Sequence, residues 1–134
     1  MLNFRSYSNV TDVVIPSKVR VIDRTSMCAY MPYLITTTLD SIYVTNMHYA
    51  YENCTNLTTA VCGPNVIDMY GAYIGCSKLT TAVCGPNVTS MERAYQDCHS
   101  LTTAVCGPNV VNMTRAYYNC TNLTGTAACG PNVT

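Results

Sequence analysis

Residues 57–78 read LTTAVCGPNVIDMYGAYIGCSK, and the next 22 residues, 79–100, read LTTAVCGPNVTSMERAYQDCHS. The same frame starts again at residue 101. A fixed period of this length is typical of repeat architectures, in which each unit buries its apolar face only against its neighbours. The sequence therefore predicts a solenoid and not a domain built around one central core.

Four kinds of side chain recur at this step and form the expected core ladder. It consists of Met47, Met69, Met91 and Met113, of Tyr51, Tyr73, Tyr95 and Tyr117, of Leu57, Leu79, Leu101 and Leu123, and of two cysteine columns, Cys54, Cys76, Cys98 and Cys120 and then Cys62, Cys84 and Cys106. Cys129 would continue the second cysteine column, but it comes one residue late because residues 123–128 contain an insertion.

Within one unit, Met47, Ala50, Tyr51 and Cys54 are spaced i, i+3, i+4 and i+7, which predicts one face of a two-turn helix. The β-branched run at residues 57–62 predicts a short strand whose side chains alternate inward and outward. The expected fold class is an α/β repeat solenoid with one short parallel β-strand and one short helix per 22-residue unit. Whether the units form an open arc or a tighter coil resembling a β-helix stays open.

The period continues upstream in a weaker form. Residues 35–47 align with residues 57–69, and residues 26–30 resemble a degenerate copy of the predicted helix. Residues 13–22 have the pattern of a strand, a turn and a second strand. Terminal repeats of solenoids are usually atypical. We therefore expect residues 1–45 to form degenerate N-terminal capping repeats, and residues 46–134 to form four regular repeats with an uncapped C-terminal end.

The pattern L-x-x-A-x-C-x-x-N at residues 57–65 resembles the strand and asparagine of leucine-rich repeats. The segment from Asn87 to Leu101 is similar to the BspA-type bacterial leucine-rich repeat, and the resemblance covers residues 35–134. Ala and Cys where Leu or Ile is usual, and a Gly-Pro turn, depart from the family pattern. The resemblance implies a leucine-rich-repeat-like fold, found in bacterial surface and adhesion proteins and in structural proteins of gut phages. It constrains fold more than function.

Composition narrows the classes of partner. Seven basic and seven acidic residues give no net charge, so nothing attracts nucleic acid or an anionic membrane at long range. No stretch approaches the roughly 20 apolar residues of a membrane span. The first nine residues lack the apolar core of a secretory signal, and nine cysteines cannot all pair internally. We expect a chain made in a reducing cytoplasm that works in a virion or an extracellular assembly.

The titratable and sulfur-bearing residues show no pattern typical of a catalytic or metal-binding site. Cysteine in a buried column behaves as a small hydrophobe, so we expect free thiols, with disulfides between stacked units as the alternative. The spacing of 22 residues is no zinc signature, and we expect neither a metal nor a cofactor. His48 and His99 do not recur in other units, and no pair of acids stands out. The chain is therefore not expected to be an enzyme.

Two surfaces are candidates for interaction. The first is an invariant, uncharged face formed by Thr59, Val61, Thr81, Val83, Thr103 and Val105. The second is a variable recognition side with His48, Tyr49, Tyr70, Glu92, Arg93, Arg115 and Tyr118. A tolerated apolar patch explains the first almost as well, and ordinary solvated surface is the simpler interpretation of the second.

The function that follows is structural. Only 10% of the residues are charged, and low charge favours association. We expect a virion-associated protein, such as a phage fibre or a capsid decoration, or a filament subunit, whose partners are other protein chains. The alternative is a bacterial surface adhesin that binds a glycan or a host receptor.

Overall fold

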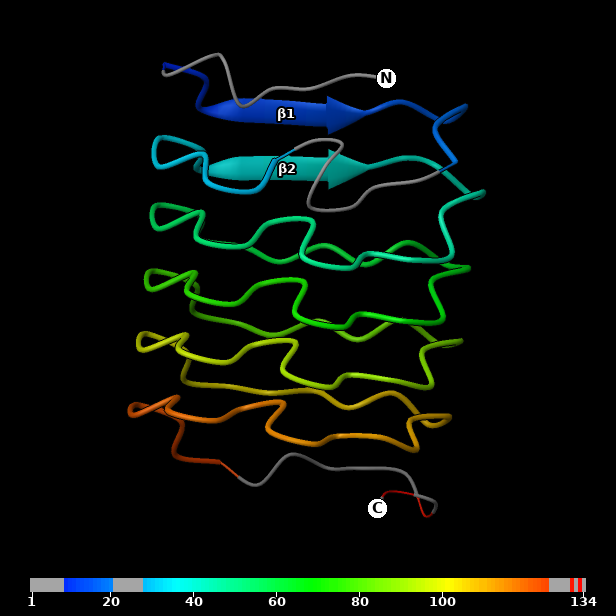
Figure 1. The fold of residues 1–134 in the computed structure, drawn as a ribbon, viewed down its shortest axis with the longest axis vertical. Helices are drawn as coiled ribbons and strands as arrows, with labels where there is room; N and C mark the ends of the chain where they lie inside the picture. The colour runs from blue at the N-terminus through cyan, green and yellow to red at the C-terminus, as the bar shows by residue number, and fades with distance from the viewer. Residues whose placement is uncertain (1–8, 21–27, 126–130, 132, 134) are drawn as a thin grey trace.

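The computed structural model describes residues 9–20, 28–125, 131 and 133. The chain forms a stack of coils in which each repeat makes one turn (Figure 1). Strand β1, Asp12–Ile15, pairs in parallel with β2, Thr36–Leu39, with Asp12 opposite Thr36 and Ile15 opposite Leu39. The later coils follow the same path below these strands. Residues 9–20 thus belong to the same stack as the regular repeats.

Isolated parallel bridges continue the pairing at a constant step of 22 residues. One column joins Asn46, Asp68, Ser90 and Asn112, and another joins Thr59, Thr81 and Thr103. The 22-residue period is therefore the step from one coil to the next, as the solenoid prediction requires.

The predicted helix in each unit is wrong, because the described residues contain no helix. The Tyr51 N–H donates to the Ala72 carbonyl at 2.8 Å, and the Asn53 N–H donates to the Ile74 carbonyl at 2.7 Å. Both bonds leave the segment for the next coil, whereas a helix would keep them inside. Tyr49 and Asn53 have φ of 53° and 57°, so left-handed residues interrupt the segment every four positions.

The predicted strand at residues 57–62 and its copies at 79–84 and 101–106 shrinks to isolated bridge residues. The tyrosine of the following turn explains the interruption. The Val61 N–H donates to the Tyr73 hydroxyl at 2.9 Å, and that hydroxyl donates to the Val61 carbonyl. The Val83 N–H donates in the same way to the Tyr95 hydroxyl at 3.1 Å. These backbone groups therefore bond across the coil and not to the neighbouring strand.

The core is a set of stacked columns between the two long sides of each coil. The rings of Tyr51 and Tyr73 lie 5.2 Å apart at 8°, and those of Tyr73 and Tyr95 lie 5.3 Å apart at 4°. These side chains are buried together with the methionines, leucines and first-column cysteines of the same coils. In the last described coil, Met113, Tyr117 and Leu123 are only partly buried.

The alignment of residue 35 with residue 57 is wrong by one position. Leu34 is fully buried like Leu57, whereas Ile35 is 43% exposed. The Thr37 hydroxyl lies 3.2 Å from the Tyr51 hydroxyl inside the core. The extra residue of this coil falls before Val44, since the Ile67 N–H bonds the Thr45 carbonyl at the regular step. The degenerate helix unit predicted at residues 26–30 lies partly outside the described residues, and Cys129 lies wholly outside them.

Candidate functional site

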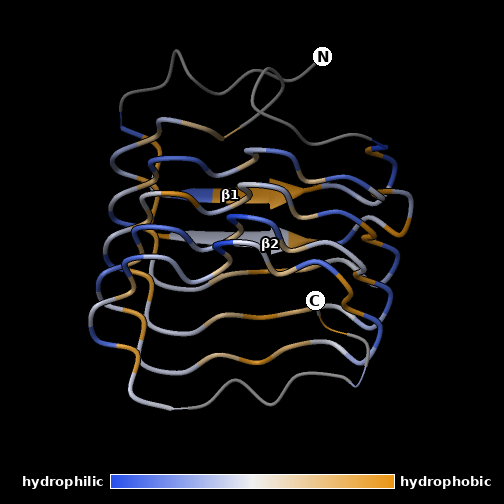
Figure 2. Cartoon of the chain, turned by 60° about the horizontal axis from the view of Figure 1, so that its bottom comes forward, coloured by the Kyte–Doolittle hydropathy of each residue, from blue (hydrophilic) through white to orange (hydrophobic). Residues whose placement is uncertain are grey.

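The invariant face predicted from the sequence lies on the outside of the coils. Thr59, Thr81 and Thr103 are exposed and are held in register by their bridges. Val83 and Val105 are 40% and 59% exposed, while Val61 is half-buried. We call the six residues of these two columns the Thr/Val face. Figure 2 shows the regular recurrence of apolar and polar segments from coil to coil.

The first two strands extend the columns of the Thr/Val face, which sequence reasoning missed. The 23-residue step from Leu34 to Leu57 places Thr36 and Thr38 in the threonine and valine columns. Thr38 pairs with Val14, which is 59% exposed. The off-by-one alignment hid this continuation, because it set the buried Thr37 in the exposed column.

Part of the variable side is brought together where the coil of residues 34–56 stacks on the coil of residues 57–78. The His48 Nε2 and Asp68 Oδ2 atoms lie 2.7 Å apart. The Tyr70 ring meets the rings of His48 and Tyr49 edge-on, with centroids 5.7 and 5.1 Å away. This makes one half-buried aromatic cluster, which the contact between His48 and Asp68 ties to the neighbouring coil.

The remaining variable residues do not join that cluster. The Arg115 guanidinium lies over the Tyr118 ring at 5.9 Å, and Tyr118 is 60% exposed. Glu92 accepts a hydrogen bond from the Asn112 amide at 3.2 Å. Arg93 takes a left-handed conformation with φ of 54°. The residues of the variable side therefore form several separate contacts and do not converge on one site.

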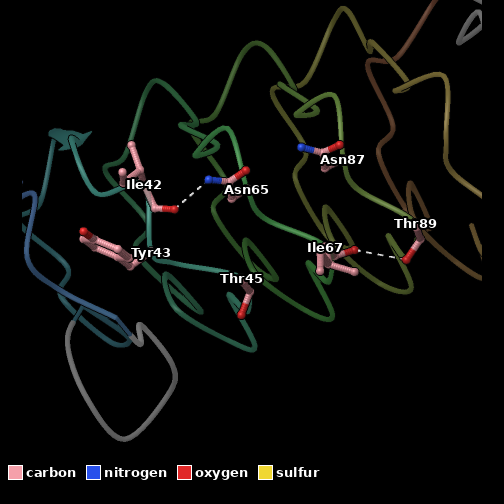
Figure 3. Close-up of a pocket in the computed structure, with 7 residues that line it drawn as sticks. All are labelled: Ile42, Tyr43, Thr45, Asn65, Ile67, Asn87 and Thr89. Atoms are coloured by element: carbon pink, nitrogen blue, oxygen red, sulfur yellow. Dashed lines mark hydrogen bonds between the residues drawn. The ribbon is translucent and has the colours of Figure 1, made fainter.

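A shallow groove, which sequence reasoning also missed, lies beyond the Gly-Pro-Asn corner (Figure 3). Its volume is about 520 Å³, and it is lined by Ile42, Tyr43, Thr45, Asn65, Ile67, Asn87 and Thr89. We call it the corner groove. It forms where Ile42 and Tyr43 replace the Pro and Asn of later coils. That departure from the repeat was the signal available in the sequence.

The cysteines are free thiols in all eight described positions. The Cys76 thiol donates to the Tyr51 carbonyl at 3.1 Å, and the Cys98 thiol donates to the Tyr73 carbonyl at 3.2 Å. Burial raises the pKa of Cys54 to about 12 and that of Cys62 to about 11. Thiols with a raised pKa stay protonated near neutral pH and are poor nucleophiles.

Within residues 9–20 and 28–125, no cluster of three or more His, Cys, Asp or Glu side chains is arranged to hold a metal ion. No helix of these residues has the length and apolar character that crossing a membrane requires.

Comparison with known proteins agrees with this geometry. A family model described as the BspA type leucine rich repeat region matches residues 3–124 in six copies. Searches of curated proteins and of solved structures found no match. Leucine-rich-repeat modules mediate protein–protein interactions, which makes this chain a repeat module of the interaction or surface type. The chain belongs to the BspA-type leucine-rich repeat family.

Proposed function

We propose that the chain is a non-enzymatic assembly module that packs its Thr/Val face against other protein chains. The observation that carries the proposal is the exposure of Val83 and Val105, at 40% and 59%, on a face whose six residues include no charge. Apolar surface left in water costs free energy at roughly 25 cal/mol per Å². A repeated β-branched surface recovers that free energy when a second protein covers it.

The backbone of this face favours a rigid docking surface. The Thr80 hydroxyl donates to the Thr58 carbonyl at 3.4 Å, and the Thr102 hydroxyl donates to the Thr80 carbonyl at 3.3 Å. The face therefore keeps its shape before a partner arrives, and binding loses little conformational entropy. We extend the proposal to a virion fibre, a capsid decoration or a filament, because such assemblies need rigid, uncharged, repeating contacts.

The test is the oligomeric state of a charged variant. Val83→Lys combined with Val105→Lys places two ammonium groups on the Thr/Val face. We expect the purified chain to self-associate and the variant to run as a smaller species in light scattering and negative-stain imaging. Val111→Lys is the matched control, because Val111 is 45% exposed on another side of the coil. A wild-type chain that stays monomeric at high concentration would refute self-assembly through this face.

The second candidate is an adhesin that binds through the variable side. The half-buried aromatic cluster of His48, Tyr49 and Tyr70 favours it, because aromatic side chains at a surface are common anchors in interfaces. Host-protein and glycan arrays probed with the wild type and with Tyr70→Ala distinguish it from the first. Blank arrays would leave only the assembly role.

A further inference from the structure

The backbone along the corner groove is already hydrogen-bonded. The Ile67 N–H donates to the Thr45 carbonyl at 2.8 Å, and the Thr89 N–H donates to the Ile67 carbonyl at 2.8 Å. The Ile42 carbonyl accepts the Asn65 amide at 2.7 Å. A peptide that binds by strand addition needs open backbone groups. These groups are occupied, so the side chains decide what the groove can hold.

The polar side chains of the groove are amides and hydroxyls, which can both donate and accept hydrogen bonds. Asn65 and Asn87 each use an amide hydrogen on the preceding coil, and Asn87 donates to the Pro64 carbonyl at 2.8 Å. Figure 3 shows the two amides in the same orientation one coil apart. The Thr89 hydroxyl donates to the Ile67 carbonyl at 3.3 Å and keeps its lone pairs. A matching ligand must therefore both donate and accept hydrogen bonds, and hydroxyl groups do both.

The rest of the groove is apolar and uncharged. Ile42, Tyr43 and Ile67 are 54%, 49% and 48% exposed. The Arg20 guanidinium lies 5.1 Å from the centre of the Tyr43 ring and covers one of its faces. None of the seven lining residues carries a formal charge. The lining itself gives a charged ligand no counter-ion, and the nearby Arg20 guanidinium is stacked on Tyr43, so a neutral ligand fits the groove better than a charged one.

We propose that the corner groove binds a neutral oligosaccharide. Sugars combine hydroxyl donors with apolar C–H faces, which fit the amide oxygens and the exposed Tyr43 and isoleucine side chains. The volume of about 520 Å³ falls within the usual size of ligand sites. Coils stack about 4.8 Å apart, so Asn65 and Asn87 present their oxygens to successive sugar residues of a chain that lies along the solenoid axis.

The test compares Asn87→Leu with Asn109→Leu in the full chain. Asn109 donates to the Pro86 carbonyl at 2.8 Å, as Asn87 does to Pro64, but it does not line the groove. The probes are hexasaccharides of β-1,4-linked glucose, N-acetylglucosamine and mannose, and of α-1,4-linked glucose, titrated by calorimetry and by NMR. We expect at least one to bind. Asn87→Leu should weaken that binding about tenfold, as the loss of one good hydrogen bond does, and Asn109→Leu should not change it.

Three outcomes overturn the proposal. These are the absence of binding by all four probes at about millimolar concentration, equal weakening by both variants, and binding of a capped neutral peptide in place of the sugars. The groove lies beyond the corner from the Thr/Val face, so sugar binding is measured independently of self-association. Val83→Lys with Val105→Lys should bind the sugar as the wild type does, which keeps the two proposals separable.

Discussion

The hydroxyl of Tyr73 closes a ring with the backbone of Val61, twelve residues earlier, by accepting its N–H at 2.9 Å and donating to its carbonyl. One side chain thus satisfies both backbone groups of a residue on the opposite side of the coil. Tyr95 forms the same pair of bonds with Val83. The tyrosine column therefore connects the two long sides of the solenoid as well as stacking along it.

Tyr73→Phe is expected to lower the free energy of unfolding by about 2 kcal/mol or more. The ring stack is retained, but the part-buried N–H and carbonyl of Val61 lose their partner, and each such loss costs about 1–3 kcal/mol when the group is buried. Urea denaturation followed by circular dichroism measures the change. Tyr118→Phe is the control, because Tyr118 is 60% exposed and should change stability little. Equal stability of both variants would contradict the bridging role of the hydroxyl.

The sequence predicted the period of the solenoid because identical residues must occupy identical positions in stacked coils. The prediction of a helix was wrong for the segment that contains Met47, Ala50, Tyr51 and Cys54, which is a series of turns. A spacing of i, i+3, i+4 and i+7 places side chains on one side of a helix, but a series of turns achieves the same result. The left-handed residues and the hydrogen bonds to the next coil distinguish the two, and those bonds join residues 21 positions apart.

The candidate sites were only partly accessible to sequence reasoning. The columns of Thr59 and Val83 were visible because they repeat without change. The corner groove was not, because Tyr43 and Ile67 become neighbours only when a weak repeat is placed in the correct register. A one-residue error between Leu34 and Leu57 was enough to hide the contribution of Thr36 and Thr38 to these columns.

Gly85→Ala should destabilise the fold by about 1–3 kcal/mol through overpacking. A Cβ at this position would lie 2.8 Å from the Cys62 Sγ atom and 3.0 Å from the Gly63 carbonyl oxygen. The backbone oxygen of the preceding coil cannot move without disturbing the stack. Thermal unfolding measures the loss, and Gly125→Ala is the control, since a Cβ there meets nothing within 4 Å. A Gly85→Ala protein as stable as the control would show that the corners are loosely packed.

Arg93→Gly should be neutral or slightly stabilising, although glycine usually weakens a structure. Arg93 has φ of 54°, where a Cβ costs about 1 kcal/mol, and glycine removes that cost. The equivalent position one coil earlier is Gly71, with φ of 60°. Gln96→Gly serves as the reference and should lose about 0.5–1 kcal/mol. Calorimetric melting of both variants compares them, and a larger loss for Arg93→Gly would be inconsistent with the left-handed turn.

Alkaline pH should destabilise the chain through its buried thiols. Burial raises the pKa of Cys54 from 9.0 to about 12, so the folded state holds this proton more tightly than the unfolded state. The resulting stability is complete below pH about 9 and is lost as pH rises from about 9 to about 12. The urea midpoint measured across this range should fall steadily. Cys54→Ser keeps a donor for the Cys28 carbonyl but does not titrate, so its midpoint should fall less steeply. Identical slopes for the two proteins would show that Cys54 titrates alike in the folded and unfolded states.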